Sequence, residues 1–200
     1  MKNAPLILIY SRLLIGFGII ILSSLQVDHY PFLAISLLTI GLLTDVFDGI
    51  IARKLNVSSE KLRRLDSGID QAFFISIAIA TYIQCPDFFK LNLIKLIILF
   101  GAEALTYLVS YIKFKKEIAT HSIGAKIWTL VLFATLVEIM AHCKSEVLFE
   151  CCLWIGLLTR LEILAIVLTL KKWTNDVPTI YHAVKLRQGK EIKRNKLFNG

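Results

Sequence analysis

Two pairs of aspartates with helical spacing stand close together in the first half of the chain. Asp45 and Asp48 lie in the run Thr-Asp-Val-Phe-Asp-Gly-Ile-Ile-Ala-Arg at positions 44–53, and Asp66 and Asp70 follow after a short loop. Residues three, four, seven or eight apart share one face of a helix. Because a short connection makes successive helices neighbours, we expect the four carboxylates to converge.

Converging carboxylates are suited to binding hard divalent cations. They repel one another unless positive charge offsets them, and their oxygens suit Mg²⁺ or Mn²⁺. Mg²⁺ usually keeps positions for water and for substrate phosphate. On the face of the first pair, Gly49 and Ala52 leave room for a bulky ligand, and Arg53 can neutralise phosphate oxygens. The pattern predicts a two-metal site for a diphosphate.

The elements that must position these residues are membrane helices. The chain of 200 residues is 56% hydrophobic, with a mean hydropathy of +0.67. A bilayer core about 30 Å thick needs ~20 apolar residues in a helix, and the apolar residues here fall in long blocks. Six blocks reach that length, at about 4–25, 31–51, 65–84, 91–112, 122–141 and 147–170. We predict an all-α integral membrane protein, a bundle of six transmembrane helices.

The distribution of Lys and Arg predicts the orientation of these helices. Basic residues gather after the second block, between the fourth and fifth blocks, and after Leu170, whereas the other loops are poor in them. Basic loops stay in the cytoplasm, so we expect both termini and the acidic site to face the cytoplasm of a bacterial inner (plasma) membrane. The net charge of +8 then reflects topology and contact with anionic membrane lipids, and we expect no nucleic acid partner.

We divide the chain into a catalytic membrane domain, residues 1–170, and a basic cytoplasmic tail, residues 171–200. The tail is interpreted either as an interfacial helix on the inner leaflet or as a disordered basic segment. On the helix, four residues would face lipid: Tyr181, Val184, Leu186 and Ile192.

The four cysteines show no paired spacing typical of metal ligands. They are Cys85, Cys143, Cys151 and Cys152. We interpret them as small apolar residues, with a disulfide near the outer face as the alternative.

Five more ionisable residues interrupt or border the apolar blocks: Arg12, Glu103, Lys126, Arg160 and Glu162. Such groups are costly inside a membrane and usually face an interior cavity or a partner. The predicted topology places all five near the level of the aspartates. Lys126 and Arg160 are our candidates for binding an anionic acceptor such as a phosphorylated polyol. A structural ion pair of Glu103 with Arg160 is the alternative, and Arg12 and Glu162 are assigned no role.

The acidic run resembles the signature of the CDP-alcohol phosphotransferase (CDP-alcohol phosphatidyltransferase) family. That signature reads Asp, two residues, Asp-Gly, two residues, Ala-Arg, eight residues, Gly, three residues, Asp, three residues, Asp. This sequence matches it at Asp45, Asp48, Gly49, Ala52, Arg53, Asp66 and Asp70. Leu62 stands where the family has its second glycine, and we expect it to narrow or reshape the nucleotide pocket. Farther along the chain, Gly124, Lys126 and Thr129 resemble the family's Gly-Lys…Thr run.

The resemblance implies a transferase of phospholipid biosynthesis. The hydroxyl of an alcohol attacks the lipid-linked phosphorus of CDP-diacylglycerol or a similar CDP-lipid, and CMP leaves. The resemblance also implies that the protein forms a homodimer. It further assigns roles to the matching residues. Metal ligation, with two ions expected, falls to Asp45, Asp48, Asp66 and Asp70; general-base catalysis falls to Asp70 as well; and contact with the CDP part falls to Gly49, Ala52 and Arg53.

The acceptor and two other functional classes stay open. We favour a phosphorylated polyol such as glycerol 3-phosphate or an inositol phosphate, with serine or another non-phosphorylated alcohol as the alternative. An aspartate-rich membrane prenyltransferase would also use Mg²⁺ and a diphosphate. The third class, a metal or proton transporter, would catalyse no transfer reaction. Release of CMP indicates the first class, release of pyrophosphate the second, and neither product the third.

Overall fold

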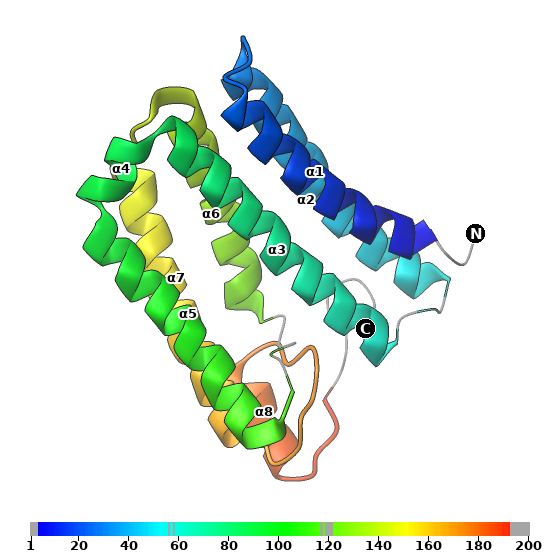
Figure 1. Cartoon of the computed structure of the whole chain (residues 1–200). Helices are drawn as coiled ribbons and strands as arrows, with labels where there is room; N and C mark the ends of the chain where they lie inside the picture. Colours follow the sequence, from blue (N-terminus) through cyan, green and yellow to red (C-terminus); the bar gives the residue numbers. More distant parts are fainter. Residues whose placement is uncertain (1–3, 56, 58, 117, 119–121, 193–200) are drawn as a thin grey trace. The chain divides into compact units, whose positions relative to one another are not determined.

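A computed structural model of the chain describes residues 4–55, 57, 59–116, 118 and 122–192, and over these residues it is helical, without strands (Figure 1). Five of its helices are long and apolar enough to cross a membrane: α1 (Ala4–Ser24), α2 (Tyr30–Lys54), α5 (Leu93–Phe114), α6 (Ile123–His142) and α7 (Val147–Thr169). The prediction of an all-α chain is confirmed, and each of these helices corresponds to a predicted span.

The other predicted span corresponds to α3 (Glu60–Gln84), which is as long as α2 but more polar. It is not among the five apolar candidates because basic residues and the second acidic pair occupy its first half. It also begins earlier than the predicted start near Leu65. The side chain of Ser59 caps it by accepting a hydrogen bond from the backbone N–H of Leu62 at 3.2 Å.

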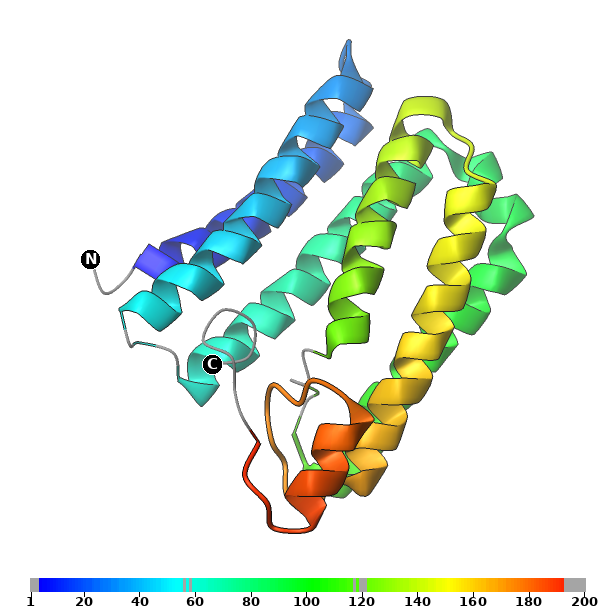
Figure 2. The same ribbon diagram turned by 180° about the vertical axis from the view of Figure 1, so that it is seen from behind.

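Two compact units make up the chain. The first comprises Met1–Leu91 and Leu136–Ser145, and the second comprises Asn92–Thr135 and Glu146–Gly200. In the first unit, α1 packs against both α2 and α3, and Figures 1 and 2 show α1 running alongside α2.

The residues on the face of α1 that packs against α2 and α3 recur every three or four positions. They are Pro5, Ile9, Arg12, Gly16, Ile19 and Ser23. Apolar side chains from α2 and α3, among them Leu38, Phe73 and Ile77, are almost fully buried. Arg12 therefore lies on the same stripe as the apolar contacts of α1 and is held inside the unit.

A close contact between α2 and α3 lies beside the acidic residues. A Cβ atom at Gly41 would come within 2.4 Å of Cζ of Phe73, although non-bonded carbon atoms prefer about 3.5–4.0 Å. Phe73 is 2% exposed, so its ring has no open space to move into. Gly41 lies one helical turn before Asp45, and Phe73 lies about one turn after Asp70. Glycine at position 41 thus leaves room on α2 for the Phe73 ring of α3, near both acidic pairs.

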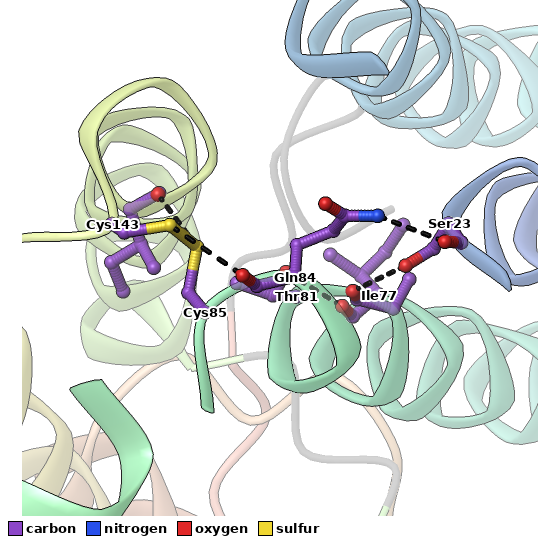
Figure 3. Close-up of a disulfide and its surroundings, with 8 residues drawn as sticks. Ser23, Ile77, Thr81, Gln84, Cys85 and Cys143 are labelled. Carbon is purple, nitrogen blue, oxygen red and sulfur yellow. Dashed lines mark hydrogen bonds between the residues drawn. A yellow bond between two sulfur atoms is a disulfide. The ribbon is translucent and has the colours of Figure 1, made fainter. Parts of the chain in front are cut away.

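A disulfide joins Cys85, at the end of α3, to Cys143, directly after α6 (Figure 3). The interpretation of these two cysteines as apolar residues is therefore wrong, and the alternative of a disulfide is confirmed, while its position near the outer face stays a prediction. Their spacing in sequence gave no signal, because the pairing depends on where two separate helices end. Cys151 is free and exposed, and Cys152 is free and buried.

Side-chain hydrogen bonds join the ends of α1 and α3 close to this disulfide. The amide of Gln84 donates to the carbonyl of Ser23 at 2.8 Å, and the Ser23 hydroxyl donates to the carbonyl of Ala80 at 2.8 Å (Figure 3). The end of the first unit remote from the aspartates is thus fixed by both covalent and polar contacts.

The loop predicted between the third and fourth blocks contains a short helix, α4 (Pro86–Leu91), which Pro86 opens at a position where its missing N–H costs nothing. In the second unit α5 packs against α7, and α7 against α8 (Ile180–Arg187). A helix is thus present in the tail over Ile180–Arg187, and the disordered alternative is wrong there, while its position on the inner leaflet stays a prediction.

The helix α8 is held by an apolar cluster at the end of α7. The buried members are Ile166, Leu170, Val177 and Ala183, and Phe114 and Leu186 pack against them. The prediction that Leu186 faces lipid is therefore wrong, because it covers this cluster. Tyr181 and Val184 are 60% and 40% exposed, and Ile192 follows the helix. Residues 193–200, which the tail prediction included, lie outside the described residues.

Candidate metal centre

The two acidic pairs meet at a single guanidinium group from a third helix. Asp45 and Asp48 lie in the second half of α2, and Asp66 and Asp70 lie in the first half of α3. Arg12 of α1 forms ion pairs with all four. Its Nη1 lies 2.8 Å from Oδ1 of Asp45 and also contacts Asp70, and its Nη2 lies 2.6 Å from Oδ1 of Asp66 and also contacts Asp48.

Burial in this cluster is deepest at its centre. The side chains of Arg12 and Asp48 are 1% and 3% exposed, whereas that of Asp45 is 37% exposed. Arg12 supplies one positive charge to these four carboxylates. Burying carboxylates together is costly unless positive charge compensates them.

The donor set fits a divalent cation. Asp45, Asp48 and Asp66 each offer one carboxylate oxygen, and these oxygens lie within 4.8 Å of one another. Hard, negatively charged oxygens are the ligands that Mg²⁺ and Mn²⁺ take. Asp70 lies outside this group of three but contacts the same guanidinium.

The residues expected to contact the CDP part follow the first pair along α2. Ala52 is buried, at 6% exposure. A Cβ atom at Gly49 would lie 3.4 Å from Nη1 of Arg53, so the Arg53 guanidinium folds back over the glycine. Leu62 is half-buried in the first turn of α3. A guanidinium beside a bare stretch of helix backbone is an arrangement that can receive a phosphate group.

The second unit holds another buried arginine, with different partners. Nε of Arg160 lies 2.5 Å from Oε2 of Glu103, and their side chains are 11% and 19% exposed. The Arg160 guanidinium also lies over the ring of Trp128, 4.5 Å from its centre, as in a cation–π contact. The Trp128 indole N–H donates to the carbonyl of Cys152 at 3.0 Å. The ion pair that we kept as the alternative for Arg160 is therefore present.

The start of α6 contacts a second carboxylate of this unit. A Cβ atom at Gly124 would lie 2.9 Å from Oε2 of Glu162, so this carboxylate reaches the first turn of α6. Negative charge is favourable at a helix N-terminus. Lys126, the other candidate for acceptor binding, follows Gly124 in the same turn and is half-buried.

Arg12 is the residue at the centre of the site that received no role from the sequence. Its place inside an apolar helix was visible, but its partners were not. The signal that could have found them is the spacing of the α1 stripe, which repeats every three or four residues through Arg12. That spacing places the guanidinium on the face that packs, and a packed cation needs an anionic partner.

Comparison with known proteins agrees with the geometry of the acidic site. The family model described as CDP-alcohol phosphatidyltransferase matches residues 2–171. No curated protein and no solved structure gives a match. The family match spans both units, including all four aspartates and Arg12. We conclude that the chain belongs to the CDP-alcohol phosphatidyltransferase family.

Proposed function

We propose that the protein transfers a phosphatidyl group from a CDP-linked lipid such as CDP-diacylglycerol to an alcohol, and releases CMP. The observation that carries this proposal is the convergence of four carboxylates from α2 and α3 on one guanidinium, in a chain of this family. A membrane enzyme that acts on a diphosphate needs such a concentration of hard ligands.

Asp45, Asp48 and Asp66 are proposed to hold the divalent ions, two Mg²⁺ or Mn²⁺. When bound, such ions polarise the phosphoryl group and stabilise the leaving phosphate. The proximity of the three carboxylate oxygens supports this assignment. These side chains also position the diphosphate, and positioning with charge neutralisation accounts for most of the catalysis of phosphoryl transfer.

Asp70 is proposed as the general base that takes the proton of the attacking hydroxyl. A carboxylate serves as a base best when metal ions occupy it least. Asp70 lies outside the group of three while remaining at the same centre, which supports this role.

Gly49, Ala52 and Arg53 are proposed to bind the CDP part. The Arg53 guanidinium, folded over Gly49, supports a role in binding phosphate. Leu62 is proposed to narrow the nucleotide pocket, since its half-buried side chain replaces a hydrogen atom in the family pattern.

The acceptor is proposed to be a small alcohol, and two candidates have support. Lys126 and Arg160 favour a phosphorylated polyol such as glycerol 3-phosphate or an inositol phosphate. The ion pair of Arg160 with Glu103 favours a non-phosphorylated acceptor such as serine, because the guanidinium already has an anionic partner.

The acidic site is proposed to face the cytoplasm of a bacterial inner membrane, and α3 is proposed to be a sixth span. The protein is also proposed to form a homodimer, as the family resemblance implies. A rise of about 1.5 Å per residue separates Asp66 from Cys85 by about 28 Å along α3, close to the thickness of a bilayer core. Disulfides form in oxidising compartments, so Cys85–Cys143 supports an outer location for that end. The acidic end then faces the reducing cytoplasm.

The test is a product assay on the purified full chain. The protein is incubated with labelled CDP-diacylglycerol, Mg²⁺ or Mn²⁺, and in turn glycerol 3-phosphate, an inositol phosphate and serine. We expect CMP and a new phospholipid with one of them, and loss of both products with EDTA or in the variant Asp66→Asn. The matched control is Asp87→Asn in α4, where the aspartate is exposed and pairs with Lys90. Release of pyrophosphate from a prenyl diphosphate would instead indicate a prenyltransferase.

A further inference from the structure

We propose that Arg12 is a built-in counter-cation of the metal centre, which holds the four carboxylates together in the metal-free protein and competes with divalent ions for them. The inference rests on the proposed function, because it takes the aspartates as metal ligands. It concerns a residue of α1, a helix that contributes none of the proposed ligands.

The contacts of Arg12 explain how the acidic pairs stay together without metal. Each terminal nitrogen of its guanidinium bridges the two helices: Nη1 pairs Asp45 of α2 with Asp70 of α3, and Nη2 pairs Asp48 with Asp66 in the same way. A lysine cannot make this arrangement, because its ammonium is a single point charge and not a planar fork. Arg12 thus links α2 to α3 at both of its nitrogens.

The burial of Arg12 shows that these ion pairs dominate its environment. Its side chain is 1% exposed, and within the described residues its Nε is buried without a hydrogen-bond partner. An unpaired buried N–H is unfavourable, so the guanidinium is held where it is by the carboxylates. The packing of α1 against both α2 and α3 keeps it at that position.

The same three carboxylates serve the guanidinium and the proposed metal ions. Arg12 contacts one oxygen of each of Asp45, Asp48 and Asp66, the three residues whose oxygens lie close enough to share an ion. A carboxylate has two oxygens, so Arg12 weakens metal binding without blocking it. A nearby positive charge also repels a divalent cation. Removal of this charge should therefore destabilise the metal-free protein and tighten metal binding.

The test compares thermal unfolding of the full chain in detergent, first in EDTA and then over a titration with Mg²⁺ or Mn²⁺. For Arg12→Gln we expect a lower Tm in EDTA than for wild type, a larger rise with metal, and a half-saturating metal concentration lower by on the order of tenfold. Arg160→Gln is the matched control, since it removes a buried arginine from the second unit. It should lower Tm and leave the half-saturating concentration unchanged.

Arg12→Lys keeps the test decisive if Arg12→Gln does not fold. It should show a lower Tm in EDTA and a smaller drop in the half-saturating concentration, because lysine keeps the charge but loses the fork. Recovery of folded Arg12→Gln by metal alone would also support the proposal. Equal or weaker metal binding in the variants, with a normal response in wild type, would overturn the role of Arg12 alone. A wild type that does not respond to metal would overturn the metal centre as well.

Discussion

Two buried arginines of this chain sit in apolar helices, and their surroundings differ in charge balance. In the first unit Arg12 faces four aspartates from two helices. In the second unit Arg160 faces Glu103 and is covered by the ring of Trp128. The Arg12 side chain is 1% exposed and that of Arg160 is 11% exposed.

The difference teaches that charge balance indicates which cluster needs a ligand. The pair of Arg160 with Glu103 is neutral as it stands, and a buried pair of this kind is stable as long as both partners remain. In the Arg12 cluster four carboxylates share the guanidinium, and three of them offer oxygens close enough together to hold a divalent cation. The first region is thus the better candidate for chemistry, and the second for holding helices together.

The largest expected effect is on turnover, in the cluster formed by Arg12 and the four aspartates. Asp70→Asn should lower kcat by about 10²–10⁴-fold, the usual contribution of a general base, because an amide cannot take the proton of the attacking hydroxyl. The stabilisation by Mg²⁺ should persist, which thermal unfolding with and without metal measures. Full turnover in this variant would remove the general-base assignment.

A change in the ion pair of Arg160 with Glu103 should lower the stability of the protein and leave metal binding unchanged. Glu103→Gln leaves Arg160 with an uncompensated buried charge and should lower the free energy of unfolding by about 3–5 kcal/mol. Glu150→Gln is the matched control, since its partner Lys95 and Glu150 itself are both 43% exposed. That change should cost less than about 1 kcal/mol. A Glu103 variant as stable as the control would contradict the view of a completed structural pair.

A smaller effect should decide whether Arg160 also binds the acceptor. If it does, Arg160→Ala raises the KM for a phosphorylated acceptor by about 10–100-fold, since hydrogen bonds to charged groups contribute about 1.5–3 kcal/mol. The KM for the CDP-lipid should change little. The double variant Glu103→Gln/Arg160→Ala removes the unpaired Glu103 carboxylate and serves as the folding control. An unchanged acceptor KM in both variants would retire the anion-binding role.

The acidic site was largely predictable because its signal is local. The spacing of Asp45, Asp48, Asp66 and Asp70 places each pair on one helix face, and a short loop keeps the adjoining ends of those helices close. The apolar helices were predictable for the same reason, since block length and composition are read directly from the chain. Most of α3 was predicted, from about Leu65 to Gln84, but its capped first turn looked like part of a basic loop.

Features that depend on distant parts of the chain could not be predicted. The disulfide of Cys85 with Cys143 depends on where two helices end. The partners of Arg12 depend on how α1 packs, and the contact of Leu186 depends on where α8 docks. Each of these contacts joins residues that are far apart in the chain, so no spacing between neighbouring residues predicts it.

The contact of Gly41 with Phe73 has a consequence for how precisely the metal ligands are held. One methyl group on position 41 would force the aromatic ring or the helices to shift by about 1 Å to regain normal contact. Cation–oxygen bonds to Mg²⁺ tolerate little variation around about 2.0–2.1 Å. Glycine at position 41, which is not one of the proposed ligands, thus helps to set the spacing of the proposed metal site.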